Sequence, residues 1–275
     1  SCVDPSIEEM KTYYAHYGCS HKIKEYYSSK GAAICQDMQR CNMSIFFEFV
    51  VDGVTTAAGK FYQELEFDAL KNREDEIIAE RDRYLDYARN AVDVEAGEYT
   101  CILAPLVTAM FTHESFGHKS ESDFMLNDKT LQDEWVMGKQ VGNEKVSICD
   151  SGNMDNNGYT PFDDEGNPAK ETWLIKNGVL TGRLHDAKSA SVLNEEITGN
   201  ARAQSYYHSP MVRMTNTYLE KGEDAPEDII SGVEDGIYVY GVNYGTGSAT
   251  FTMQPNLCYR IRGGKLCEPV RANVI

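Results

Sequence analysis

The chain has 275 residues, of which 41% are hydrophobic, so it can bury one large core or two smaller ones. Its 43 acidic and 26 basic residues give a formal net charge of −17, which argues against a nucleic-acid partner because phosphates are met by clustered Lys and Arg. No apolar run approaches the roughly 18 residues of a membrane span and the first residues do not resemble a signal peptide, so we expect a cytoplasmic protein without membrane contact.

The first elements combine a helical signal with a longer extended one. Ser6, with Glu9 three residues later, is typical of a capped helix start, which predicts a helix that ends at Gly18. From His21 onward the residues favour extended backbone. We therefore expect one short helix at the front, followed by a meander of strands and not by a βαβ unit.

A hairpin and a long helix come next. The apolar run 44–51 predicts a strand, and Asp52-Gly53 is the sequence of a two-residue turn into a second strand over 54–62. Apolar residues then recur at a 3.6-residue period within 66–94, with charged residues between them, which predicts a helix with one solvated face. These elements predict an incomplete N-terminal α+β domain over residues 1–97.

Two histidines that bracket a glutamate carry the clearest chemical signal, His113-Glu114-x-x-x-His118. They lie at the end of a mostly apolar helix predicted over 106–116, which follows a short buried strand at 99–103. Neutral imidazoles bind zinc, and an adjacent glutamate can take a proton from water on the metal. The pattern predicts a zinc hydrolase with two histidine ligands and Glu114 as catalytic base; a pair of exposed or core histidines is the other interpretation.

The spacing of the two histidines requires a distorted helix. In the familiar H-E-x-x-H motif the two rings lie about 40° apart around the axis, whereas His113 and His118 would lie about 140° apart on an ideal helix. A π-bulge adds one residue to a turn and would bring the rings together, and Gly117 lowers the cost of the distortion. We therefore expect a π-bulge between the two histidines.

The rest of the chain is predicted to be mostly antiparallel β. Asn177-Gly178 between apolar runs predicts a hairpin over 172–184. The other expected elements are a helix at 131–141, a strand at 145–149, a helix at 186–193, a loop at 198–202, a strand at 211–219, a helical turn at 226–232 and strands from 237 to 275 with a hairpin turn at 262–265. These elements predict a C-terminal β-rich domain over 98–275 that carries the metal-binding helix, and an α+β fold for the whole chain.

Two other groups of metal-binding residue types point to structure and not to a site. The carboxylates between Asp150 and Lys170 do not follow the spacing of a calcium loop, and turn chemistry explains their abundance. The eight cysteines contain no C-x-x-C pair, so free thiols are the expected state.

Five segments, in the same order, resemble the TldD/PmbA metalloproteases, once called modulators of DNA gyrase. The resemblance is close from about residue 98 to 275 and looser before that. The segments are 113–123, 162–166, 174–180, 198–202 and 213–217.

The resemblance implies a zinc peptidase that cleaves unstructured peptides or unfolded protein with low sequence specificity. It also implies a homodimer, or a heterodimer with a PmbA-like subunit. PmbA-like members lack the histidine motif, so this chain is similar to the catalytic, TldD-like kind. Zinc would then be bound by His113 and His118, and Glu114 would activate the water.

One departure from the family concerns the third zinc ligand. The resemblance implies a Cys in a Gly-rich segment beyond the last matched strand, and the chain stops before it, so we expect a member shortened at both ends. Cys258 and Cys267 are interpreted as core or edge thiols. Glu121 is a candidate substitute ligand, with a helix-surface acid as its other interpretation. The alternative function is a non-catalytic peptide-binding or dimerisation subunit that lacks a complete metal site.

Overall fold

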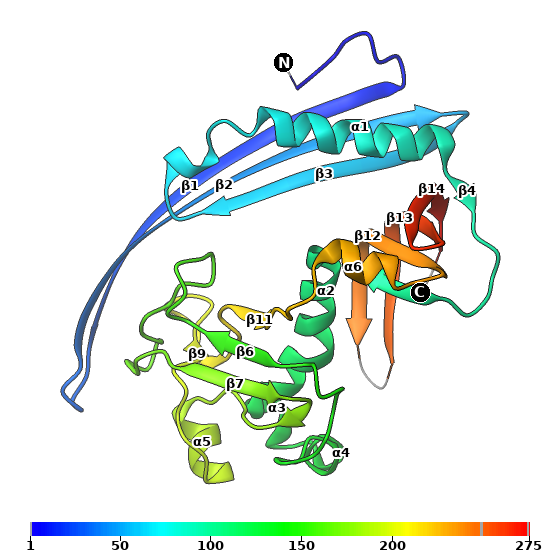
Figure 1. Ribbon diagram of the computed structural model, residues 1–275. Helices are drawn as coiled ribbons and strands as arrows, with labels where there is room; N and C mark the ends of the chain where they lie inside the picture. Colours follow the sequence, from blue (N-terminus) through cyan, green and yellow to red (C-terminus); the bar gives the residue numbers. More distant parts are fainter. Residues whose placement is uncertain (1, 248–249, 274) are drawn as a thin grey trace.

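The computed structural model describes residues 2–247, 250–273 and 275, which form three larger sheets, a two-stranded ladder and several helices (Figure 1). Helix α2 (Pro105–Thr112) lies between the two C-terminal sheets, in contact with a strand of each. This arrangement confirms an α+β fold built mostly from antiparallel strands. Among the helices of the described residues, none has the length and apolar character that a membrane crossing needs.

An antiparallel sheet of three strands, in the order β1-β2-β3, forms the N-terminal part. The strands are β1 (Met10–Tyr27), β2 (Ala33–Val51) and β3 (Val54–Glu64). Between β2 and β3, Asp52 and Gly53 have φ angles of 50° and 79°, the left-handed values that a type I′ turn requires. The predicted hairpin is therefore confirmed.

The helix predicted to start at Ser6 is wrong, because this segment enters the sheet as β1. Ser6 does not cap a helix; its N–H and hydroxyl donate to Oδ1 of Asp4 at 2.9 and 2.7 Å in a turn. Tyr14 of β1 stacks on Phe46 of β2, with ring centroids 4.7 Å apart. Aromatic side chains fit a pleated surface, and pairing with β2 outweighs the local helical signal.

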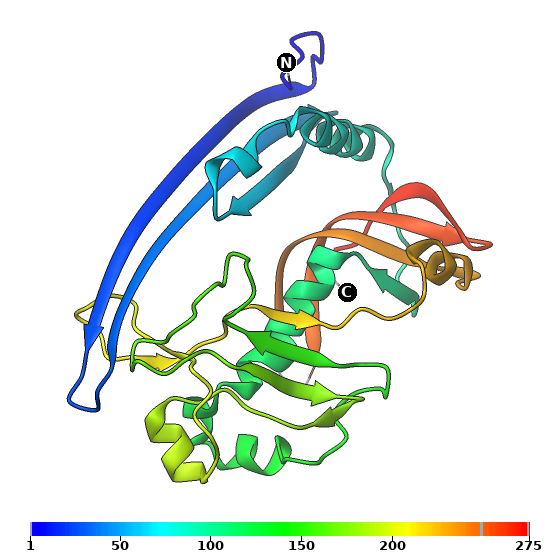
Figure 2. The same cartoon turned by 60° about the vertical axis from the view of Figure 1, so that its left-hand side comes forward.

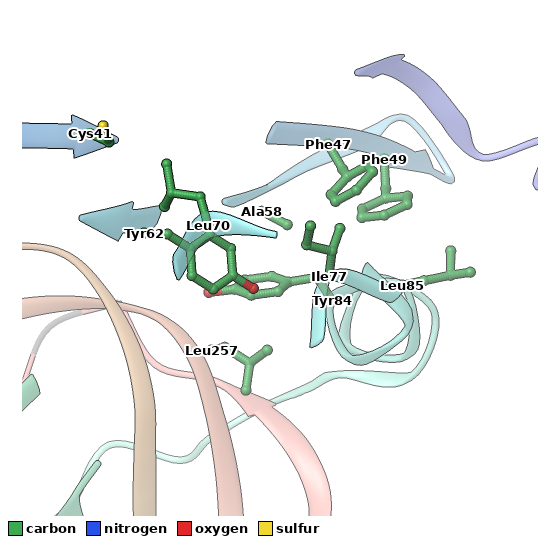
Figure 3. Close-up of a cluster of buried hydrophobic side chains, with 10 residues drawn as sticks. All are labelled: Cys41, Phe47, Phe49, Ala58, Tyr62, Leu70, Ile77, Tyr84, Leu85 and Leu257. Carbon is green, nitrogen blue, oxygen red and sulfur yellow. The ribbon is translucent and has the colours of Figure 1, made fainter. Parts of the chain in front are cut away.

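Helix α1 (Glu74–Asn90) covers one face of this sheet, within the range predicted for a long helix. It starts later than expected because a short 3₁₀ helix, Phe67–Leu70, precedes it. Apolar residues of α1, the 3₁₀ helix and the sheet form a buried cluster, here called the α1 cluster, to which one residue of β13 contributes (Figure 3). The cluster consists of Cys41, Phe47, Phe49, Ala58, Tyr62, Leu70, Ile77, Tyr84, Leu85 and Leu257.

Strands β1 and β2 continue past the end of β3 as a two-stranded arm, residues 20–40 (Figure 2). The last residue of β3, Glu64, pairs with Cys41, and the arm begins at the next rung. The sheet therefore narrows from three strands to two at this point.

The arm docks on the loop 157–165 of the β-rich part. Lys24 forms an ion pair with Asp164, with 2.7 Å between Nζ and Oδ1, and both side chains are mostly buried. Arg40 donates from Nη2 to the carbonyl oxygen of Tyr159 at 2.7 Å. These contacts connect the N-terminal sheet to the part of the chain that carries the histidine motif.

A five-stranded sheet, in the order β4-β14-β13-β12-β5, begins the β-rich part. Its three central strands are antiparallel, whereas β4 and β5 add in parallel at the two edges. The predicted strand before α2 and the turn at 262–265 are both present. The strands are β4 (Val92–Asp93), β5 (Thr100–Leu103), β12 (Asp235–Gly247), β13 (Phe251–Arg262) and β14 (Lys265–Arg271).

A four-stranded antiparallel sheet, in the order β11-β6-β7-β8, lies on the other side of α2. Asn177 and Gly178 have φ angles of 51° and 77°, which confirms the predicted hairpin between β7 and β8. The strands are β6 (Ile148–Ser151), β7 (Glu171–Lys176), β8 (Val179–Leu180) and β11 (Thr217–Leu219).

The strand expected over 211–219 is interrupted. Its start, β10 (Met211–Val212), pairs with β9 (Ala201–Arg202), and its end is β11. Between them, the N–H of Thr215 donates to Oδ1 of Asp150 at 2.8 Å, so a side chain takes the place of a neighbouring strand.

The short helices of the β-rich part agree with the predictions at 186–193 and 226–232. The helix predicted over 131–141 is shorter, because the backbone leaves the helical region at Trp135. These helices are α3 (Ser122–Met125), α4 (Lys129–Glu134), α5 (Ala187–Leu193) and α6 (Pro226–Ser231).

Candidate metal centre

The histidine motif continues helix α2 without a break. Pro105 is placed in the first turn of α2, where its missing N–H costs nothing, and Val107 and Thr112 are buried. The helix then widens over His113–Gly117, where the N–H of His118 donates to the carbonyl of the residue five positions before it. This is a π turn, so the predicted π-bulge is confirmed.

Gly117 lies against the side chain of Met214. A Cβ atom at this position would lie 2.1 Å from Sδ of Met214, which is itself buried. On the adjacent residue, the ring of Phe116 packs edge-on against Phe111, with centroids 5.5 Å apart. Packing on both sides therefore fixes the π turn.

Replacing Gly117 with Ala is expected to destabilise the protein by about 1–3 kcal/mol, because an added methyl group in a packed core displaces its neighbours. Thermal unfolding measures the effect. Gly142→Ala is a matched control, since a Cβ there makes only ordinary contacts of 3.7 Å or more. Shortening Met214 to Ala should remove the clash, so the costs of the double variant should not add. Additive costs would contradict this explanation.

The π turn brings His113, Glu114 and His118 together. One possible ligand atom from each of the three side chains lies within 4.8 Å of the others. The two imidazole rings have centroids 4.6 Å apart and planes at 78°. The rings thus converge on one region of space instead of lying on different sides of a helix.

Charge and exposure suit these side chains to a divalent cation. His113 is exposed and the other two are partly buried. Desolvation and the neighbouring His118 lower the pKa of His113, which favours the neutral imidazole that binds metal. Two neutral imidazoles beside a carboxylate match the donors that zinc prefers, so the residues present fit this metal.

Glu121 is fully buried, so its interpretation as a helix-surface acid is wrong. It is also outside the group that could hold a metal. Its Oε2 accepts a hydrogen bond from Nδ1 of His118 at 2.8 Å, and its Oε1 accepts one from the N–H of Met214 at 3.3 Å. Burial raises the pKa of Glu121, while His118 and Arg213 act in the opposite direction. A carboxylate on the second ring nitrogen commonly orients a metal-binding histidine.

The residues after Glu121 anchor it to the β-rich part. Ser122 donates from its hydroxyl to the carbonyl of Leu184 at 2.5 Å and also lies 2.9 Å from Nδ1 of His185. On its other side, Nε2 of the buried His185 lies 2.9 Å from a carboxylate oxygen of Glu195. Sequence reasoning did not find this network, although the three-residue spacing of His118 and Glu121 was a signal for the first contact.

Two of the carboxylates considered for calcium, those of Asp150 and Asp163, accept hydrogen bonds from the protein. Asp150 accepts hydrogen bonds from the hydroxyls of Thr215 and Thr217, at 2.7 and 2.6 Å, and from the amide of Asn200. Asp163 accepts them from two backbone N–H groups of its own turn at 3.0 and 2.8 Å. These aspartates therefore organise loops, as turn chemistry predicts.

The two late cysteines differ in environment. Cys258 is fully buried in β13, as expected for a core thiol, whereas Cys267 is exposed on β14. Neither belongs to the group around His113. From the described residues, the chain thus offers two imidazoles and one carboxylate to a metal at this centre.

The comparisons with known proteins identify the family of the chain. The sequence profile of the PmbA/TldA metallopeptidase C-terminal domain matches residues 96–275. A metalloprotease of Synechocystis is 38% identical over 180 residues, which are 65% of this chain and 39% of that protein. The zinc metalloprotease TldD homolog of Saccharolobus solfataricus is 31% identical over 276 residues, which are 97% of this chain and 60% of that protein.

Solved structures share the fold. TldE from Thermococcus kodakarensis superposes with a TM-score of 0.81 at 19% identity, over 93% of this chain and 58% of that one. A putative modulator of a DNA gyrase from Thermotoga maritima superposes with a TM-score of 0.79 at 20% identity, over 97% of this chain and 61% of that one. The chain thus spans between about two fifths and three fifths of the length of these relatives. Because the matched profile covers well over half of the chain, this protein belongs to the PmbA/TldA metallopeptidase family.

Proposed function

We propose that this chain carries the catalytic zinc site of a TldD-like peptidase that cleaves unstructured peptides with little sequence specificity. The observation that carries the proposal is the convergence of His113, Glu114 and His118 across the π turn. The name of the Saccharolobus relative, a zinc metalloprotease, supports the choice of metal.

In this proposal each side chain has one role. His113 and His118 would bind the metal through neutral imidazoles, and Glu121 would hold the Nδ1 proton of His118, which leaves Nε2 of that ring as the ligand atom. Bound zinc supplies a Lewis acid that lowers the pKa of water and polarises a peptide carbonyl. Glu114 accepts a proton from water at a carboxylate oxygen and passes it to the nitrogen of the leaving amine.

The substrate would lie as an extended strand beside the π turn. β11 is the outer strand of its sheet and contacts the π turn, so its free edge offers backbone hydrogen bonds close to the two histidines. Backbone pairing reads little side-chain information, which accounts for low sequence specificity. We further propose that the chain works as a dimer with a second copy or with a PmbA-like subunit, in the cytoplasm.

The alternative is a non-catalytic, peptide-binding or dimerisation subunit. One observation favours it. If Glu114 serves as the base, the described residues leave only His113 and His118 as ligands, whereas catalytic zinc sites have three from protein. The same strand edge would then bind peptides without cleaving them.

Metal analysis of the purified full-length protein separates the two functions. The enzyme is expected to contain about one zinc per chain. It should cleave an unfolded casein and lose cleavage when a chelator removes the metal, and added zinc should restore it. Peptide binding without zinc and without cleavage would support the alternative and overturn the peptidase proposal.

A further inference from the structure

A second pair of reactive side chains lies away from the metal centre, at the root of the arm. Cys19 of β1 and Cys41 of β2 are direct partners across the two strands, and their Sγ atoms are 3.0 Å apart. Cys19 is exposed, whereas Cys41 is buried at the end of the α1 cluster (Figure 3). Both are free thiols.

The rung that holds the two thiols has the geometry of a cross-strand disulfide site. The pairing of β1 with β2 runs without a shift from Thr12 to Tyr27. At the turn, the N–H of Ser28 donates to the carbonyl of Ala32, so these two residues form a hydrogen-bonded pair. The two kinds of pair alternate along an antiparallel ladder, so the other hydrogen-bonded pairs also lie at even-numbered residues of β1. Cys19 is therefore in a non-hydrogen-bonded pair, where the Cα atoms lie about 4.5 Å apart and the side chains approach closely. That separation lies within the range of disulfides.

The position of this rung gives a disulfide a structural consequence. Cys41 also pairs with Glu64, the last residue of β3, so the sheet loses its third strand at this rung. A two-stranded ribbon is only marginally stable without further support. A covalent link here would join the strands at the root of the arm, next to Arg40, which docks on the loop 157–165; Lys24, further along the arm, docks on the same loop.

We propose that Cys19 and Cys41 form a site of reversible thiol oxidation, at which a hydroperoxide converts the pair to a cross-strand disulfide. The pKa of the Cys41 thiol is raised by its hydrogen bond with Cys19 and, to a smaller extent, by burial. The exposed Cys19 therefore reacts first. The proposal does not depend on the peptidase activity.

The reaction has two steps. Sγ of Cys19 attacks the peroxide, the O–O bond breaks, and a sulfenic acid and one water are formed. Sγ of Cys41 then attacks Sγ of Cys19, the S–O bond breaks, and a second water leaves. With hydrogen peroxide, two thiols lose two electrons and two protons, and the peroxide becomes two waters.

Peptide mapping tests the link directly. The native full-length protein is treated with hydrogen peroxide, its free thiols are alkylated, and trypsin is added. Cleavage after Lys and Arg places Cys19 in peptide 12–22, Cys35 in 31–40 and Cys41 in 41–60. We expect peptide 12–22 joined to 41–60, and release of both by dithiothreitol. Sulfinic acid on Cys19 with Cys41 alkylated, or a link to Cys35 instead, would overturn the proposal.

Cys35 supplies the matched control, because it is an exposed thiol on the same strand whose cross-strand partner is Glu25. Cys35→Ser should leave the linked product unchanged, whereas Cys19→Ser should abolish it.

Hydrogen exchange tests the structural consequence. Amides in the arm, residues 20–40, should exchange about tenfold or more slowly in the linked protein than in the reduced one, because the link suppresses separation of the two strands. Amides of β13 should not change. Equal exchange in the arm would show that the disulfide does not stabilise it.

Discussion

Replacing Glu114 with Gln is expected to reduce kcat for peptide cleavage by about a hundredfold to ten-thousandfold while zinc stays bound. Gln has nearly the same shape as Glu, but its neutral amide cannot take a proton from water. His113 and His118, which hold the metal in our proposal, are unchanged. Cleavage of an unfolded, dye-labelled casein gives the rate, and elemental analysis gives the zinc content of the same sample.

Glu144→Gln is the matched control, because Glu144 is exposed and lies outside the metal group. This variant should have the same cleavage rate and the same zinc content as the parent protein. Full activity in the Glu114 variant would refute its role as base. Loss of zinc together with activity would instead make Glu114 a ligand.

Removal of the Glu121 carboxylate is expected to weaken zinc binding by about tenfold to a hundredfold, the usual effect of losing a carboxylate that orients a metal-binding histidine. Glu121→Ala leaves Nδ1 of His118 without its acceptor. Glu121→Gln keeps one oxygen, which can satisfy either His118 or the N–H of Met214 but not both. Zinc affinity should therefore be highest with Glu at position 121, lower with Gln and lowest with Ala. Competition with a chromogenic chelator measures these affinities without any need for activity.

Asp123 allows the effect on zinc to be separated from a loss of structure. Asp123 lies two residues after Glu121, and its carboxylate accepts a hydrogen bond from the N–H of Val212 at 3.2 Å. Asp123→Asn should lower thermal stability without lowering zinc affinity. If the Asp123 and Glu121 variants weaken zinc equally, Glu121 acts through general stability and not through His118.

Local signals were sufficient for the features that depend on a few neighbouring residues. The five-residue spacing of His113 and His118 predicted the π turn, because the helix geometry left no other way for the rings to meet. Asp52-Gly53 and Asn177-Gly178 predicted two hairpins, because both turn residues need left-handed backbone that these types tolerate.

Features set by distant partners could not be predicted in this way. The segment after Ser6 carried a helix signal, but β2 supplied a strand for it to pair with. The sequence leaves Glu121 as a substitute ligand or a surface acid, because nothing near it shows that Met214, more than ninety residues later, donates to it. Burial of a charged residue is decided by the fold and not by the helical period.

The docking of the arm on the loop 157–165 also has a consequence for synthesis on the ribosome. The arm leaves the ribosome about 120 residues before its docking surface, which at 5–20 residues per second means a wait of roughly 6 to 24 seconds. During that interval the nascent chain exposes an unsupported ribbon whose edges invite pairing with other chains. Shielding by a chaperone during this interval should therefore raise the yield of the folded protein.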